Sequence, residues 1–114
     1  KTRVHRDDDL YALGRDDLTM MASDLGITET DLRMLLPKAA DNSLLMERMM
    51  VARGLDPDRV RRTSAGLMRE LELACARCGA VSRCRRDLDQ GTAARHSHEY
   101  CLNAETFDEL LAGA

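Results

Sequence analysis

The sequence predicts a small all-α domain. Aromatic residues make up 3% of the chain and tryptophan is absent, whereas β sandwiches and barrels normally draw on aromatic and β-branched residues. The apolar residues are mainly Leu, Met, Ala and Val, and they recur at helical spacing between recognisable cap and stop signals. A chain of 114 residues has the length of one domain. We therefore expect a single domain, residues 1–114, of five or six helices.

The N-terminal part of the chain divides into a polar segment and a helical one. Residues 1–15 are mostly polar and are expected to be flexible. Residues 16–55 are expected to form the N-terminal helices. The first of these runs from Asp16 to Leu25, and Gly26 follows as a left-handed stop.

A second helix is predicted to begin after Thr28, which can cap it, with Asp31 at the capping-box position. Pro37 is expected to break or kink this helix soon after Leu36. The segment LLMERMMVAR then predicts a further helix, which Gly54 ends. Three cap signals precede that helix: Asp41, Asn42 and Ser43.

One face of this third helix is rich in sulfur, being formed by Leu45, Met46, Met49, Met50 and Ala52. Thioethers can bind soft metals. Methionine is also an adaptable residue for filling a core. We interpret this face as core packing.

Residues 56–114 are predicted to hold a long helix followed by a cysteine-bearing module. Asp56 and Pro57 give a strong helix start, as cap and first residue. The helix is expected to continue to the first cysteine, because residues recur at helical spacing along one stripe. The stripe consists of Val60, Ser64, Leu67, Leu71 and Cys75.

The remainder of the module is predicted to contain two shorter helices. Val81, Cys84 and Leu88 mark one face of the first, and Gly91 stops it. Residues 92–100 are interpreted as a polar loop. Asn103 is then expected to cap a final helix that contains Phe107, Leu110 and Leu111.

The chain has four cysteines, and all of them fall in one quarter of its length. They are spaced Cys-x2-Cys-x5-Cys-x16-Cys: Cys75, Cys78, Cys84 and Cys101. A two-residue gap lets one turn direct two thiolates at a common point. Cys84 lies on an apolar helix face, and Cys101 precedes a helix start whose free N–H groups can stabilise negative charge. We expect a metal or cluster site that joins the C-terminal helices.

Positive charge is also expected near the thiols. Nearby arginines can lower the pKa of a cysteine. The residues expected to do so are Arg77, Arg83, Arg85 and Arg86.

The ligand of this site is left open by the residues. Four thiolates suit zinc and iron–sulfur clusters alike, but zinc sites usually pair two short-spaced knuckles and this chain has one. His96 and His98 are possible alternative ligands, or loop histidines in solvent. Four buried free cysteines, or disulfides, are the remaining alternatives.

The segment CARCGAVSRCRRDL is similar to the Cys-x2-Cys-x5-Cys segment of WhiB-like iron–sulfur regulators, and the same spacing occurs in endonuclease III-type DNA glycosylases. This resemblance implies a four-iron cluster on a helical scaffold, although both families place the fourth ligand upstream and here it is Cys101. The glycosylase catalytic residues are absent. Residues 18–112, ending in the helix start CLNA, also resemble a family of short uncharacterised proteobacterial proteins with a C-terminal four-cysteine helical module.

The stretch MMASDLGITETDLRMLL resembles a DNA-binding helix-turn-helix, with Ala22, Gly26 and Leu32 at its small, turn and buried positions. Its second helix would begin with two carboxylates, Glu29 and Asp31, which oppose binding to phosphates. We therefore favour a helical hairpin that packs on the core or binds a partner.

A basic surface for a protein partner or nucleic acid is also predicted, although no aromatic residues interleave with it to stack on bases. It comprises Arg59, Arg61, Arg62, Arg83, Arg85 and Arg86.

No nucleophile–base pair, phosphate-binding loop or HExxH motif stands out, so we do not expect an enzyme, although electron transfer is compatible with the site. The net charge of −3, the lack of a membrane-spanning run and the lack of a signal-peptide pattern favour a cytoplasmic protein. The first residue, Lys1, leaves open whether residues precede it.

The leading hypothesis is an iron–sulfur protein, with a 4Fe–4S cluster favoured, that has a redox or gas-sensing role through a protein partner. The alternatives are a zinc-stabilised protein-interaction module and a helix-turn-helix-like transcriptional regulator. The zinc alternative assigns the four cysteines to one metal ion, and the regulator alternative assigns DNA binding to the helical hairpin.

Overall fold

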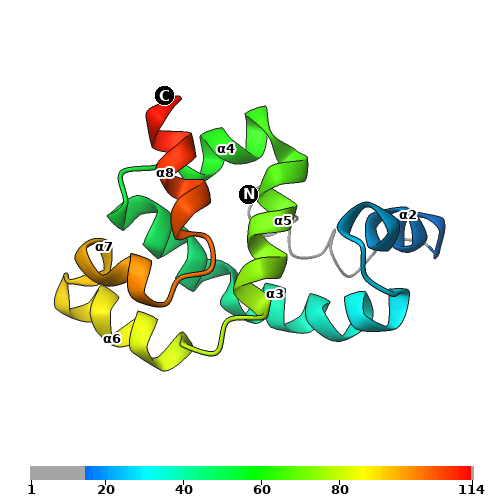
Figure 1. Cartoon of the computed structure of the whole chain (residues 1–114), viewed down its shortest axis with the longest axis horizontal. Helices are drawn as coiled ribbons and strands as arrows, with labels where there is room; N and C mark the ends of the chain where they lie inside the picture. Colours follow the sequence, from blue (N-terminus) through cyan, green and yellow to red (C-terminus); the bar gives the residue numbers. More distant parts are fainter. Residues whose placement is uncertain (1–14, 114) are drawn as a thin grey trace.

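The structure, a computed structural model, describes residues 15–113, and these residues contain α-helices and one 3-10 helix but no strand (Figure 1). The all-α prediction is therefore confirmed for this part of the chain, with seven α-helices rather than five or six. The flexible segment predicted for residues 1–15 lies, apart from Arg15, outside the described residues. The elements are α2 Arg15–Leu25, α3 Glu29–Ala52, α4 Pro57–Thr63, α5 Ala65–Ala76, α6 Val81–Gln90, α7 Ala93–His96, η1 Ser97–Glu99 and α8 Ala104–Ala112.

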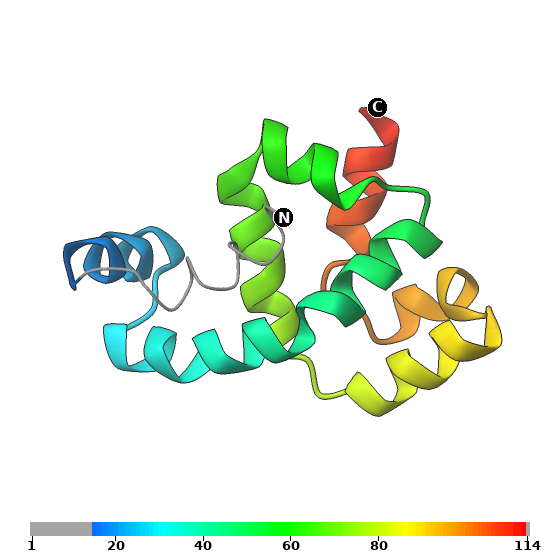
Figure 2. The same cartoon turned by 180° about the vertical axis from the view of Figure 1, so that it is seen from behind.

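The long helix α3 is the base on which the other elements are arranged (Figure 2). α5 packs across it. α2 lies at one end of α3, and α6, α7 and α8 gather at the other end. Within residues 15–113, no helix combines the length and the apolar character that crossing a membrane would require.

The turn between α2 and α3 forms as predicted. Gly26 has a φ of +69°, the left-handed conformation that favours glycine. The backbone N–H of Ile27 donates to the carbonyl oxygen of Ala22 at 3.0 Å, which closes the end of α2. Thr28 then caps α3, because its hydroxyl oxygen accepts a hydrogen bond from the N–H of Asp31 at 3.0 Å.

Of the two outcomes predicted at Pro37, a break or a kink, the break is wrong, because α3 continues through Pro37 to Ala52. Proline lacks an N–H and crowds the carbonyl group four residues earlier. Pro37 is exposed, so water can satisfy that carbonyl group. The helix stays continuous because residues on both sides of Pro37 are buried, with Leu36 and Ala39 in the core. α3 nevertheless bends between its two halves (Figure 2).

The three expected cap residues therefore lie inside α3 and have other roles. The side-chain amide of Asn42 donates to the carbonyl oxygen of Cys75 at 3.3 Å, which ties α3 to the end of α5. The hydroxyl of Ser43 donates to the carbonyl oxygen of Ala40 at 3.0 Å. Gly54, with a φ of +88°, follows the end of α3 as predicted.

The predicted long helix after Pro57 is wrong, because it is broken at Ser64 into α4 and α5. The start is as expected, since a carboxylate oxygen of Asp56 accepts from the N–H of Asp58 at 3.0 Å. Ser64 has a φ of −149° and a ψ of 64°, which is outside the helical region. It ends one helix and begins the next: its N–H donates to Val60, and its carbonyl accepts from Met68.

The buried apolar side chains form two clusters, and α3 and α5 contribute to both. The cluster under α2 comprises Leu18, Met21, Ala22, Leu32, Leu36, Ala39, Leu73 and Ala76. The cluster under α4, α7 and α8 comprises Met46, Met49, Met50, Val60, Met68, Leu71, Ala93 and Phe107. The interpretation of the methionines of α3 as core residues is confirmed for Met46, Met49 and Met50, whereas Ala52 is exposed.

The polar loop predicted for residues 92–100 is instead the short helix α7 followed by η1. Burial explains the difference, because Ala93 and Ser97 are almost completely enclosed. Asn103 lies at the predicted cap position of α8 but makes no capping hydrogen bond with its side chain. Its amide instead donates to the carbonyl oxygen of Leu71 at 2.9 Å and fixes the start of α8 against α5.

We predict that Pro37→Ala stabilises the protein, because it restores a helical hydrogen bond at an exposed position of a continuous helix. The free energy of unfolding should rise by about 1–3 kcal/mol. Urea unfolding followed by circular dichroism measures the change. Lys38→Ala, at the neighbouring exposed position, is the control and should have little effect. A loss of stability in Pro37→Ala would show that the chain requires a break at this position.

Candidate metal centre

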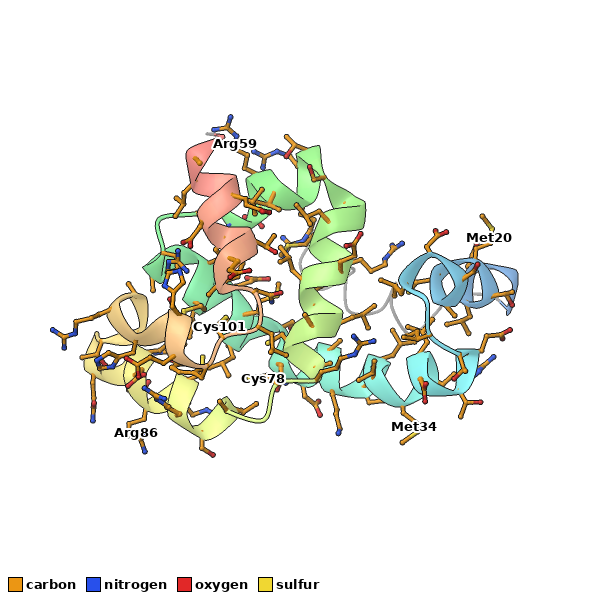
Figure 3. All side chains as sticks on the ribbon, viewed as in Figure 1. Met20, Met34, Arg59, Cys78, Arg86 and Cys101 are labelled. Carbon is orange, nitrogen blue, oxygen red and sulfur yellow. The ribbon has the colours of Figure 1, made fainter. Side chains whose placement is uncertain are left out.

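The four cysteines, which are spread over 27 positions of the sequence, line one cavity of about 30 Å³. Cys75 lies in the last turn of α5, Cys78 in the following turn, Cys84 on α6 and Cys101 between η1 and α8. The labelled Cys78 and Cys101 lie near each other in Figure 3, although they come from distant segments. The other lining residues are Leu45, Met46, Met49, Val81, Tyr100, Leu102, Asn103 and Phe107.

The end of α5 places Cys75 and Cys78 on the same side of a tight turn. The N–H of Cys78 donates to the carbonyl oxygen of Cys75 at 3.1 Å. The N–H of Ala80 donates to the sulfur of Cys78 at 3.3 Å. Both thiols line the same cavity, and a backbone N–H is directed at one of them.

The other two cysteines reach the cavity from separate segments. Cys84 lies in the first turn of α6, where its N–H donates to the carbonyl oxygen of Ala80 at 2.9 Å. The N–H of Cys101 donates to the carbonyl oxygen of Ser97 at 2.8 Å. Burial raises the pKa of Cys101, and the N–H groups of Asn103 and Ala104, which donate to this thiol, offset part of the rise.

Burial dominates the electrostatics of the thiols. It raises the pKa of Cys75 from 9.0 to about 12 and that of Cys84 to about 11, and the neighbouring thiols raise both further. Burial also raises the pKa of Cys101. In the metal-free chain, Cys75, Cys84 and Cys101 are therefore held protonated at neutral pH.

The prediction that four arginines lower the pKa values of the thiols is wrong. Arg77, Arg85 and Arg86 are exposed to solvent, which screens their charge. Arg83 is bonded to Glu99 and lies over the ring of Tyr100, with its guanidinium carbon 4.6 Å from the ring centroid.

Burial raises the pKa of Cys101, and the cation that offsets part of this rise is Arg53, which was not among the four predicted arginines. Arg53 lies 48 positions before Cys101 in the chain, at the end of α3. Nothing in its sequence neighbourhood indicated a connection with the cysteines.

All four cysteines are free thiols, so the disulfide alternative is not what the structure contains. Within residues 15–113, no three His, Cys, Asp or Glu side chains are arranged to hold a single metal ion. The four cysteines line one cavity, but the structure does not arrange them as the ligands of a single ion.

Residues 34–113 match a family of unknown function, DUF6455. This chain belongs to the DUF6455 family. The expectation of an uncharacterised family is confirmed, over residues 34–113 rather than 18–112. The match contains all four cysteines and excludes α2. The chain matches no curated protein and no solved structure.

The two histidines proposed as alternative ligands do not line the cysteine cavity of this DUF6455 protein. The Nδ1 atom of His96 lies 3.7 Å from a carboxylate oxygen of Asp87. The Nε2 atom of His98 lies 2.6 Å from a carboxylate oxygen of Asp108. Both side chains are therefore engaged with carboxylates on neighbouring helices.

The six arginines proposed as a basic surface do not form one continuous patch. Arg59 on α4 lies at the top of the view in Figure 3, whereas Arg86 on α6 lies at the bottom. Arg61 is largely buried in an ion pair with Glu47 at 2.9 Å. The exposed members are Arg59, Arg62, Arg85 and Arg86.

The helix-turn-helix-like unit of the DUF6455 chain packs as a hairpin. Ala22 and Leu32 are buried as predicted, in the cluster that also contains Leu73 and Ala76 of α5. The hydroxyl of Thr19 donates to a carboxylate oxygen of Glu29 at 2.9 Å, which joins α2 to the start of α3. The first turn of α3, the second helix of this unit, contains two acidic residues, Glu29 and Asp31.

We predict that the reduced, metal-free DUF6455 chain loses stability as the pH rises above 9. Unfolding returns the pKa of Cys75 and Cys84 to 9.0, so the unfolded chain ionises first. The thiols' contribution is complete below pH 9 and is lost between pH 9 and 12. Urea unfolding with reductant and chelator across this range measures the effect.

Cys84→Ala should make the dependence of stability on pH shallower, whereas Ser82→Ala, on the exposed side of the same helix, should leave it unchanged. Stability that stays constant from pH 8 to pH 11 would contradict the burial of these thiols.

Proposed function

We propose that this chain is a cytoplasmic iron–sulfur protein that binds a 4Fe–4S cluster and has a redox or gas-sensing role through a protein partner. The observation that carries the proposal is that all four cysteines line one cavity. The ligands would be Cys75, Cys78, Cys84 and Cys101.

The donor set fits such a group. Four thiolates are the usual ligands of iron–sulfur clusters, and here the remaining cavity wall is mostly apolar. One zinc ion, with Zn–S bonds of about 2.3 Å, would require the four sulfurs to come within about 4 Å of one another. A 4Fe–4S cluster attaches each thiolate to a separate iron atom, so its four ligands need not converge on one point as those of a zinc ion must.

The chain can also offset negative charge at the site. The N–H of Ala80 is directed at the sulfur of Cys78, and the N–H groups of Asn103 and Ala104 are directed at Cys101. Hydrogen bonds of this kind favour the thiolate over the thiol and tune metal–thiolate centres. Because burial keeps Cys75 and Cys84 protonated, loading would displace protons from these thiols.

A bound cluster supplies reversible one-electron transfer and sensitivity to oxygen or nitric oxide. The candidate site connects three segments of the fold, because the cysteines lie on the end of α5, on α6 and on the segment before α8. Loss of the group would release these three segments from a common attachment. The junction of α5 with α6 and α8 is therefore the element proposed to report the state of the site to a partner.

The proposal is tested by purifying the protein without air and measuring its absorption spectrum, iron and acid-labile sulfide. We expect a brown protein with about four irons per chain, the content of a 4Fe–4S centre. A colourless protein with about one zinc per chain would replace the proposal with the zinc-stabilised interaction module. Protein without either metal, after iron–sulfur reconstitution, would refute both.

We predict that single substitutions, Cys75→Ser, Cys78→Ser, Cys84→Ser and Cys101→Ser, each lower the iron content and the visible absorption severalfold. His96→Ala and His98→Ala are the matched controls, because both histidines lie outside the cavity, and they should keep wild-type iron content. Iron loss in a histidine variant and its retention in Cys101→Ser would transfer the fourth ligand to that histidine.

A further inference from the structure

We propose that Arg53 is a positioning residue for the cysteine site, which fixes the segment that carries Cys101 and sets the reduction potential through its buried positive charge. The inference rests on the proposed function for its redox part. The positioning part concerns the polypeptide alone.

The contacts of Arg53 lie on both sides of Cys101 in the sequence. One guanidinium nitrogen donates to the hydroxyl of Ser97 at 3.2 Å and to the carbonyl oxygen of Ala104 at 3.4 Å. The second nitrogen is paired with Asp108 on α8. The guanidinium also lies over the ring of Phe107, 5.9 Å from its centroid. A single side chain from the end of α3 therefore holds the approach to Cys101 and the helix that follows it.

The contact with Ser97 leads directly to Cys101. The same serine accepts, through its carbonyl oxygen, the hydrogen bond from the N–H of Cys101 at 2.8 Å. Ser97 is completely buried, so its position is set by its neighbours and not by water. Arg53 thus orients Cys101 through one intermediate residue, in the manner of outer groups that orient metal ligands.

The charge of Arg53 is poorly screened on the side that faces the protein. Its side chain is 7% exposed, whereas the side chain of its partner Asp108 is 48% exposed. Water weakens the field of the carboxylate more than that of the guanidinium. The net effect at Cys101 is therefore that of a positive charge.

A fixed positive charge favours the reduced state of a thiolate-ligated centre, because reduction adds one negative charge. Removing it should therefore make the potential more negative. Removing the opposing carboxylate should make it less negative. These two changes of opposite sign separate an electrostatic role from a general loosening of the fold.

The test is an anaerobic redox titration of the iron-loaded protein with dithionite, followed by visible absorption. In Arg53→Gln we expect the equilibrium constant for reduction to fall about tenfold, which corresponds to about 59 mV for a one-electron couple. Arg53→Lys keeps the charge and should stay near the wild-type potential. Asp108→Asn should shift the potential in the opposite direction, by a smaller amount.

Arg61→Gln is the matched control, because Arg61 is the other largely buried arginine of the described chain with a helix-to-helix ion pair, and it does not line the site. It should lower stability and leave the potential unchanged. Equal shifts of the reduction potential in Arg53→Gln and Arg61→Gln would overturn the electrostatic role. A reduction potential that stays at the wild-type value in both Arg53→Gln and Asp108→Asn would overturn it as well.

Hydrogen exchange of the iron-free protein tests the positioning role separately. The amide of Cys101 should exchange about tenfold faster in Arg53→Gln, as expected for the loss of about 1.4 kcal/mol of local stability. In Arg53→Lys the Cys101 amide should exchange at an intermediate rate. In Arg61→Gln its exchange should not become faster relative to that of the other amides of the chain. Unchanged protection in Arg53→Gln would overturn the positioning role. A protein that binds no iron but shows this loss would refute the proposed function and retain the positioning role.

Discussion

The packing of α5 across α3 is the contact on which the rest of the structure depends. Both helices serve two hydrophobic clusters, with Leu73 and Ala76 of α5 in one and Met68 and Leu71 in the other. Because the two sets adjoin along α5, with Leu71 and Leu73 only two positions apart, a shift of this helix would disturb both clusters together. The last turn of α5 also carries Cys75, so the same packing places the first thiol of the candidate site.

Polar contacts from α3 and α8 fix the end of α5 and the cysteine segments around it. Asn42 bonds to the carbonyl oxygen of Cys75, Asn103 bonds to that of Leu71, and Arg53 holds the segment before α8. Each contact joins residues more than thirty positions apart. The site is thus supported by buried side chains whose hydrogen bonds are made, which is how an otherwise small domain can hold reactive groups in a defined arrangement.

The local features of the chain were accessible from the sequence because they depend on near neighbours. The Gly26 stop, the Thr28 and Asp56 caps and the Gly91 stop are each set by backbone groups within a few residues. The wrong predictions concern places where distant packing outweighs local preference. Pro37 is tolerated because α3 is buried on both sides of it, and residues 93–99 become helical because Ala93 and Ser97 enter the core.

The sequence by itself determined the all-α class and the candidate ligand set, since helical periodicity and the spacing of rare cysteines are properties of the chain. Only the tertiary structure decided that Cys75, Cys78, Cys84 and Cys101 line one cavity, and that His96 and His98 lie outside it. It also decided which arginine contacts the segment that carries Cys101: Arg53, far away in sequence, rather than the arginines beside the cysteines. The physical reason is that a charge acts strongly where burial removes water, and burial is a property of the folded chain.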